Sequence, residues 1–203
     1  MPAAEWDVHF ELIAAIEALK RERNAVVLAH NYQRPEIFHG VADVVGDSLE
    51  LARQAAQSTA DVIVMCGVRF MAETAKLLAP EKTVLLPDLE AGCSLADSIT
   101  PEDVRALRRQ HPGVPVVCYV NTSAAVKSEC DACCTSSNAQ LVVESFGAPE
   151  VILVPDEYLA AYVAANTRVR IIPGRGPCEV PGRFTGEEVR EYRKSTQAYV
   201  LAH

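Results

Sequence analysis

Two cysteines at matching places are the residues in this 203-residue chain whose type and spacing best suit chemistry. Cys93 follows the turn Glu90-Ala91-Gly92, and Cys178 follows Gly174-Arg175-Gly176-Pro177, 85 residues later. About sixty residues before each cysteine, a strand-like apolar run ends in polar residues. Thiolates are soft ligands that favour iron–sulfur clusters or zinc. A repeat that brings one thiolate per unit to a common point predicts a shared metal centre.

The other five cysteines fit structural positions better. Cys66 and Cys118 fall inside expected strands, where cysteine acts as a small hydrophobic residue. Cys130 and Cys133 are spaced like a redox or zinc pair, but no second Cys or His pair at zinc-finger spacing accompanies them. Cys133 and Cys134 lie in a short strand-like run, in which adjacent side chains point to opposite faces. A thiol-redox protein using Cys130 and Cys133 is kept as one alternative.

Composition narrows the class of protein. Apolar residues make up 49% of the chain and aromatic residues only 6%, as expected where helices cover parallel sheets. A net charge of −8 without any Lys/Arg run argues against a nucleic-acid binder. No apolar run approaches the roughly 20 residues that a membrane span needs. Seven cysteines, and an N-terminus without the features of a secretory signal, favour the cytoplasm over an oxidising compartment.

Strand-like and helical patterns alternate along the chain after an amphipathic helix over about 7–23. The expected strands span 25–29, 61–66, 83–87, 114–120, 151–154, 169–172 and 198–202. The expected helices span 47–57, 69–79, 101–111, 136–146, 156–165 and 185–196. This alternation predicts right-handed βαβ crossovers and an α/β fold with short parallel sheets.

The pattern repeats, which predicts pseudo-symmetric, three-layer α/β domains. The first repeat with the N-terminal helix is assigned to 1–113, and the second to 114–197. Each holds three expected strands, and the turn His111-Pro112-Gly113 divides them. Residues 198–203 are interpreted as the first strand of a third repeat that this sequence does not contain.

Three segments at expected strand ends are rich in hydroxyl groups: 46–48, 121–123 and 135–138. Helix N-termini present N–H groups and a positive dipole end, so they suit phosphate or carboxylate. Ordinary helix capping is the alternative for each segment. Because ligands of α/β sheets gather at the carboxyl ends of strands, three such segments together favour a binding site.

Residues suited to proton transfer follow the first strand of each repeat. His30-Asn31-Tyr32-Gln33 ends the first strand, and Tyr119 and Asn121 end its counterpart in the second repeat. An imidazole or phenol at such a place can exchange protons with a substrate. The alternative is a hydrogen-bonded loop without a catalytic role.

Six motifs in the same order resemble those of quinolinate synthases, over nearly the whole chain. They span 28–33, 46–52, 66–75, 87–97, 119–127 and 134–139. The resemblance implies a cytoplasmic transferase that condenses iminoaspartate with dihydroxyacetone phosphate to quinolinate in de novo NAD biosynthesis. It also implies a functional link to an aspartate oxidase, and neither nucleic acid nor membrane as a partner.

The resemblance further implies three pseudo-symmetric α/β domains that each give one cysteine to a [4Fe–4S] cluster. Cys93 and Cys178 match the first two ligands, and the third is not in this sequence. In the family the fourth iron has no protein ligand and acts as a Lewis acid on substrate-derived intermediates, which agrees with the general chemistry of open iron sites.

Catalytic and substrate-binding residues are likewise implied. The positions that match catalytic residues of the family are Tyr32, Tyr119 and His203. The positions that match its substrate-binding residues are His30, Ser48, Asn121 and Ser136.

Two departures from the family pattern bear on activity. Family members usually carry a histidine where this chain has Pro181, and proline can neither donate a hydrogen bond nor accept a proton there. The family also continues beyond the motif that His203 opens. The chain alone is therefore expected to hold a cluster poorly and turn over little, and a truncated, non-catalytic metal or small-anion binding module is the alternative function.

Overall fold

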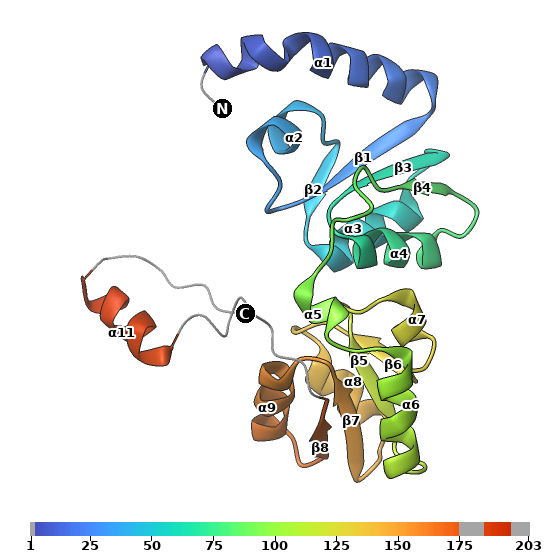
Figure 1. Ribbon diagram of the computed structural model, residues 1–203, viewed down its shortest axis with the longest axis vertical. Helices are drawn as coiled ribbons and strands as arrows, with labels where there is room; N and C mark the ends of the chain where they lie inside the picture. The colour runs from blue at the N-terminus through green and yellow to red at the C-terminus, as the bar shows by residue number, and fades with distance from the viewer. Residues whose placement is uncertain (1–2, 175–184, 196–203) are drawn as a thin grey trace. The chain divides into compact units, whose positions relative to one another are not determined.

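A computed structural model of the chain describes residues 3–174 and 185–195. It divides the chain into two compact units, Met1–Cys93 and Ser94–His203. Each unit holds one four-stranded parallel sheet with helices on both faces, so the predicted three-layer α/β fold class is confirmed (Figure 1). Cys178, Pro181, His203 and the expected strand 198–202 lie outside the described residues.

The sheet of the first unit has the strand order β2-β1-β3-β4. Its strands are β1 (Ala25–His30), β2 (Val44–Gly46), β3 (Val62–Cys66) and β4 (Thr83–Leu85). Figure 1 shows that α1 (Ala3–Glu22) and α2 (Pro35–Gly40) cover one face of this sheet, and that α3 (Ser48–Gln57) and α4 (Arg69–Leu78) cover the other.

Helical spacing of apolar residues explains both cores of the first unit. Ile13 and Ile16 of α1 pack with Ile37 of α2 on the strand residues Val27 and Ala29. On the opposite face, α3 and α4 each bury one apolar stripe. The buried residues of these stripes are Leu51, Ala52 and Ala55, and Phe70, Met71 and Ala75.

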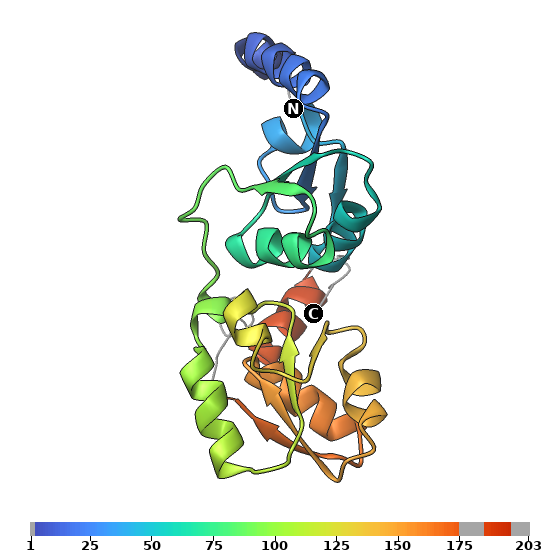
Figure 2. The ribbon, with the colours of Figure 1, turned by 90° about the vertical axis from the view of Figure 1, so that its right-hand side faces the viewer.

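The second unit repeats this topology with the strand order β6-β5-β7-β8. Its strands are β5 (Val116–Tyr119), β6 (Ala132–Cys134), β7 (Glu150–Val154) and β8 (Arg170–Pro173). Figure 2 shows α6 and α8 on opposite faces of this sheet. The helices are α5 (Ser94–Asp97), α6 (Pro101–Gln110), α7 (Ala124–Lys127), α8 (Ala139–Ser145), α9 (Glu157–Asn166) and α11 (Gly186–Ser195).

The structure corrects the prediction of three strands per repeat. Strand β2, of three residues, was not expected, and β6 (Ala132–Cys134) was noted only as a short strand-like run and not counted among the strands. Helix α8 begins at Ala139 rather than at 136, because residues 136–138 form a turn. Helix α6 packs Val104 against Val116 in the second unit, so the compact units divide before α6, whereas the predicted repeats divide at 113.

A buried lysine ties α1 to the first sheet. Lys20 Nζ lies 2.8 Å from Asp43 Oδ1 and donates to the Val41 carbonyl at 2.9 Å. The other carboxylate oxygen of Asp43 accepts the Val27 N–H at 2.7 Å. We call this arrangement of helix cation, aspartate and strand N–H a strand clamp, because it fixes the start of β1 to the residue that precedes β2.

The second unit has the same strand clamp. Arg108 of α6 lies 2.9 Å from Asp131 Oδ2 and donates to the Glu129 carbonyl, also at 2.9 Å. Asp131 Oδ2 accepts the Val116 N–H at 2.8 Å. Both sheets are thus held at the amino end of their first strand by one buried or half-buried cation. In the described ranges, no helix is both long and apolar enough to cross a membrane.

Candidate functional site

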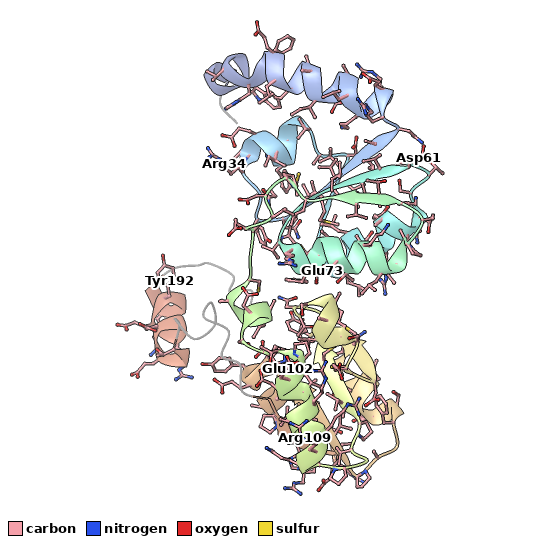
Figure 3. The ribbon with its side chains drawn as sticks, turned by 45° about the vertical axis from the view of Figure 1, so that its right-hand side comes forward. Arg34, Asp61, Glu73, Glu102, Arg109 and Tyr192 are labelled. Carbon is pink, nitrogen blue, oxygen red and sulfur yellow. The ribbon has the colours of Figure 1, made fainter. Side chains whose placement is uncertain are left out.

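The predicted site residues of the first unit lie at the carboxyl end of its sheet. His30 ends β1 and pairs with Gly46, which ends β2. Arg34, in the loop after β1, and Asp61, just before β3, lie on opposite sides of the unit and mark the carboxyl and amino ends of the strands (Figure 3). All four strands are parallel, so the loops after them meet at one edge.

His30 and Tyr32 form a contacting pair at this edge. Their ring centroids lie 4.0 Å apart with an interplanar angle of 41°. The Tyr32 N–H donates to His30 Nδ1 at 3.4 Å, so the proton of the neutral imidazole belongs on Nε2. Burial lowers the pKa of His30, and the opposing charge of Asp47 only partly offsets this effect. The imidazole is therefore neutral at pH 7 and presents an N–H donor.

Cys93 lies close to Tyr32. Burial raises the pKa of the Tyr32 phenol, and negative charge at Cys93 raises it further, so Tyr32 stays protonated at pH 7. The thiol of Cys93 is free and half-buried. Its loop is tied to the start of α4, where the Arg69 N–H donates to the Ala91 carbonyl at 2.9 Å. The fold thus brings the imidazole of His30, the phenol of Tyr32 and the thiol of Cys93 near one another at this edge.

The segment 46–48 is an ordinary helix cap as well as a candidate binding segment. Asp47 Oδ1 accepts the N–H groups of Leu49 and Glu50 at 2.9 and 2.8 Å. These two donors, which were expected to face an anionic ligand, are paired with the chain's own carboxylate. Ser48 is half-buried and is the first residue of α3. In this segment it remains the predicted contact for a ligand.

In the second unit, the predicted residues also gather at the carboxyl end of the sheet. The buried Tyr119 ends β5 beside Cys134 of β6. The Val120 N–H donates to the Cys134 carbonyl at 2.8 Å, and Thr122 Oγ1 donates to the Tyr119 carbonyl at 2.9 Å. These bonds place the half-buried Asn121 next to the residues that follow β6.

The residues that follow β6 form a turn closed by its own side chains. The Thr135 N–H donates to Asn138 Oδ1 at 2.7 Å, and the hydroxyls of Thr135 and Ser137 lie 2.9 Å apart. Ser136 is half-buried within this turn. In the third hydroxyl-rich segment, Ser123 caps α7 by accepting a backbone N–H. Capping therefore accounts for part of segments 46–48 and 121–123, and hydrogen bonds within a turn account for part of 135–138.

Lys127 is a positioning residue that the sequence did not reveal. Its Nζ donates to the carbonyls of Val120, at 2.8 Å, and Thr122, which flank Asn121. The side chain thereby fixes the loop that carries a predicted ligand contact. A lysine in the last turn of a short helix usually favours the helix dipole, so residue type alone gave no signal for this role.

The metal prediction rests on Cys93 alone in the part of the chain that the structure describes. Among residues 3–174 and 185–195, no group of three or more His, Cys, Asp or Glu side chains is arranged to hold a metal ion. A half-buried, free thiol in a tied loop fits one ligand of an iron–sulfur cluster. A surface hollow of about 540 Å³ in the second unit contains none of the predicted site residues, since it is lined by Glu144 and residues 165–169.

Fold and site together define a parallel α/β protein with its candidate site beyond the carboxyl ends of the strands, where this class binds small ligands. In the first unit an imidazole, a phenol, a hydroxyl and a thiol lie at this edge, and in the second unit a phenol, an amide and a hydroxyl; such groups suit proton transfer and the binding of anions. The two units share one strand topology.

Comparison with known proteins shows that the chain belongs to the quinolinate synthetase A protein family, whose model matches residues 14–203. It is 64% identical to quinolinate synthase of Agrobacterium fabrum, over 100% of the chain and 59% of that protein. It is also 64% identical to quinolinate synthase 1 of Mesorhizobium japonicum, over 100% of the chain and 63% of that protein. A Xylella fastidiosa quinolinate synthase is 64% identical over 94% of the chain and 57% of its own length. The chain thus spans about three fifths of the length of these relatives.

Proposed function

We propose that this chain belongs to a quinolinate synthase that condenses iminoaspartate with dihydroxyacetone phosphate in the cytoplasm, as a step of NAD biosynthesis. Its family membership and its identity with quinolinate synthases along its whole length carry the proposal. The ring contact of His30 with Tyr32 and the electrostatic interaction of Tyr32 with Cys93 support it, because they bring acid–base groups near a thiol, the kind of group that ligates iron. Iminoaspartate is an oxidised form of aspartate, which supports the predicted link to an aspartate oxidase.

Cys93 and Cys178 are the proposed ligands of a [4Fe–4S] cluster. Bound in this family, such a cluster supplies a Lewis-acidic iron that polarises oxygen or nitrogen groups of a substrate. The half-buried Cys93 suits this role because its sulfur is accessible and its loop is tied to α4. The buried Cys66, by contrast, has a pKa raised by burial, which disfavours the thiolate that a metal needs.

The remaining proposed residues bind the anionic substrates and move protons. In the first unit, His30 would donate through Nε2 and Ser48 through its hydroxyl, both without a charge of their own. Tyr32 would donate its phenolic proton, because its raised pKa keeps it protonated. Neutral donors aimed at substrate oxygens can stabilise negative charge as it develops during the dehydration steps.

In the second unit, Tyr119 would exchange a proton with the substrate, and Asn121 and Ser136 would hold it. The supporting observations are the shared edge of β5 and β6 and the two Lys127 bonds that fix the loop around Asn121. His203 is proposed as a further catalytic residue from its matching position alone.

Anaerobic reconstitution with iron and sulfide tests the proposal on the natural polypeptide that contains these 203 residues. We expect a [4Fe–4S] spectrum and quinolinate formation from iminoaspartate and dihydroxyacetone phosphate. The Cys93→Ser variant should lose both, while Cys66→Ser, a matched change at a buried cysteine of the same unit, should retain both.

Two outcomes would contradict the proposal. A full cluster without quinolinate formation would refute the assigned reaction. Calorimetric titration with a dicarboxylate distinguishes the enzyme from the alternative, a small-anion binding module. The module would be established if the chain bound the dicarboxylate tightly in the absence of iron and showed no turnover. Cys93→Ser should then leave this binding unchanged. The family assignment itself does not depend on either result.

A further inference from the structure

A second pair of thiols lies in the second unit, apart from the proposed cluster ligands. Cys118 of β5 and Cys133 of β6 are partners in the parallel strand register. Register partners have their Cα atoms about 4.8 Å apart and their side chains on the same face of the sheet. Disulfides join cysteines whose Cα atoms are roughly 4.4 to 6.8 Å apart, so this pair falls within the range.

The two thiols also interact electrostatically. The pKa of Cys118 responds to the thiols of Cys130 and Cys133, and Cys118 Sγ donates to the Ala132 carbonyl at 3.5 Å. Cys118 is only 1% exposed and belongs to the core beneath α6 and α7. Cys133 is exposed on β6, the edge strand of the sheet. The pair therefore joins a residue that is exposed on the edge strand to one that is buried in the core.

We propose that Cys118 and Cys133 are a reversible oxidation site, which closes to a cross-strand disulfide when a peroxide reaches Cys133. The Cys133 sulfur attacks the peroxide, so that an S–O bond forms, the O–O bond breaks and one water (or alcohol) leaves. The Cys118 sulfur then attacks the Cys133 sulfur, the S–O bond breaks and a second molecule of water leaves. Two thiols lose two electrons and two protons, and one peroxide gains them.

Electrostatics set the pH range of this reaction. The hydrogen bond with Cys130 raises the pKa of Cys118 to about 12. The interaction with Cys118 raises the pKa of Cys133 as well. Thiolate is the reactive form, so oxidation is slow at neutral pH and accelerates about tenfold for each unit of increasing pH. The pair should thus stay reduced except under strong or prolonged exposure to peroxide.

The position of the pair gives the bond a structural consequence. Tyr119 directly follows Cys118, and Cys134 directly follows Cys133. A disulfide would therefore restrain β5 against β6 one residue before the edge that carries the proposed substrate contacts of this unit. The oxidation site itself does not rest on the proposed enzyme function and is testable in any polypeptide that contains the unit.

Peptide mapping tests the site after hydrogen peroxide treatment of dilute protein under non-reducing conditions. Trypsin cleaves after Lys127, which separates Cys118 from the later cysteines, and a second cleavage before Asp131 separates Cys130 from Cys133. We expect a Cys118–Cys133 linked peptide, two hydrogen atoms lighter than the sum of its parts, that dithiothreitol reverses. It should form faster at pH 9 than at pH 7.

Matched variants make the result decisive. Cys133→Ser changes an exposed side chain, so the fold should be retained and the linked peptide lost. Cys130→Ser should keep the linked peptide, because Cys130 is not a register partner of either strand residue. A bond from Cys130 to Cys118 or to Cys133, a link only between two copies of the chain, or irreversible oxidation of Cys133 alone would each overturn the proposal.

Discussion

The two units of the molecule share their framework more closely than their chemistry. Lys20 and Arg108 lie 88 residues apart, as do Asp43 and Asp131, and each pair occupies the same place in its strand clamp. Sheet order and helix placement also match. The clamp works equally with an ammonium or a guanidinium group, because both donate to an aspartate and to the carbonyl two residues before it.

The carboxyl edges of the two sheets differ in residue type at corresponding positions. His30 and Tyr32 of the first unit correspond to Tyr119 and Asn121 of the second, each 89 residues later. The first edge thus carries an imidazole and a phenol, and the second carries a phenol and an amide at the corresponding positions. The framework holds the strand ends in place, and the side chains at those ends are free to differ in function.

The largest loss of stability is expected when the aspartate of either strand clamp is replaced, and it tests whether the two units share one framework. Asp43→Ala and Asp131→Ala should each destabilise their unit by about 1 to 3 kcal/mol, because the N–H of a buried strand residue loses its acceptor. Urea unfolding measures the loss. Hydrogen exchange should accelerate at Val27 in the first variant and at Val116 in the second.

The asparagine variants are the matched controls for this prediction. An amide oxygen can still accept the strand N–H, so Asp43→Asn and Asp131→Asn should cost less than the alanine changes. If only one of the two alanine variants loses stability, the clamps are not energetically equivalent and the shared framework is a likeness of shape alone.

The next largest loss of stability is expected when alanine replaces a closely packed glycine at the end of a strand. A Cβ at Gly174, after β8, would lie 2.7 Å from Val154 Cγ1 and 3.2 Å from its Cα, so backbone must move. Gly174→Ala should therefore cost about 1 to 3 kcal/mol. A Cβ at Gly67, after β3, would meet mainly the flexible end of Met71, at 2.8 Å from its sulfur.

Gly67→Ala is thus the matched control in the first unit, with an expected cost below about 1 kcal/mol because Met71 can change rotamer. Thermal unfolding of the two variants measures the difference. Equal losses at the two positions would show that the carboxyl end of the second sheet is no more tightly packed than that of the first.

Long elements were predicted reliably from the sequence, short ones unevenly, and distant pairings not at all. Helices α3 and α4 bury apolar residues at helical spacing, and their predicted bounds agree within a residue. Of the three-residue strands, β4 was expected, β6 was noted only as a strand-like run, and β2 was not expected. Asp131 shows no sign in the sequence that it accepts an N–H from Val116, 15 residues away, since loop aspartates are common.

The candidate site followed the same rule. Positions at the carboxyl ends of parallel strands favoured a binding site at this edge, where His30, Tyr32 and Cys93 lie near one another. Helix capping was the alternative for each hydroxyl-rich segment, but the particular hydrogen-bond partners were not predicted. The donors at the start of α3 are taken by Asp47, and the loop around Asn121 is held by Lys127. Both outcomes depend on side-chain rotamers, which residue spacing does not specify.

A smaller loss of stability is expected at acidic pH. Burial raises the pKa of Asp131, but its hydrogen bond from Val116 and its pairing with Arg108 outweigh burial and lower the pKa below its ordinary value of 3.8. The stability that this carboxylate contributes is therefore present above pH 3.8 and lost as pH falls through the lowered folded-state value. Unfolding monitored from pH 6 to pH 2 should show the loss, and Asp131→Asn should lack that part of it.

The smallest effect is expected in the pKa of His30, and it tests how the carboxyl edge of the first sheet differs from that of the second. His30 should titrate below its ordinary value of 6.5 in NMR spectra of the imidazole, because burial disfavours its charged form. Its folded-state pKa is lowered, so its contribution to stability is present above pH 6.5 and lost as the imidazole is protonated. Asp47→Asn should lower the value further, since the Asp47 charge raises it. A midpoint above 6.5, or one that rises in Asp47→Asn, would mean that the first edge is cationic near neutral pH and binds anions by charge rather than by neutral donors.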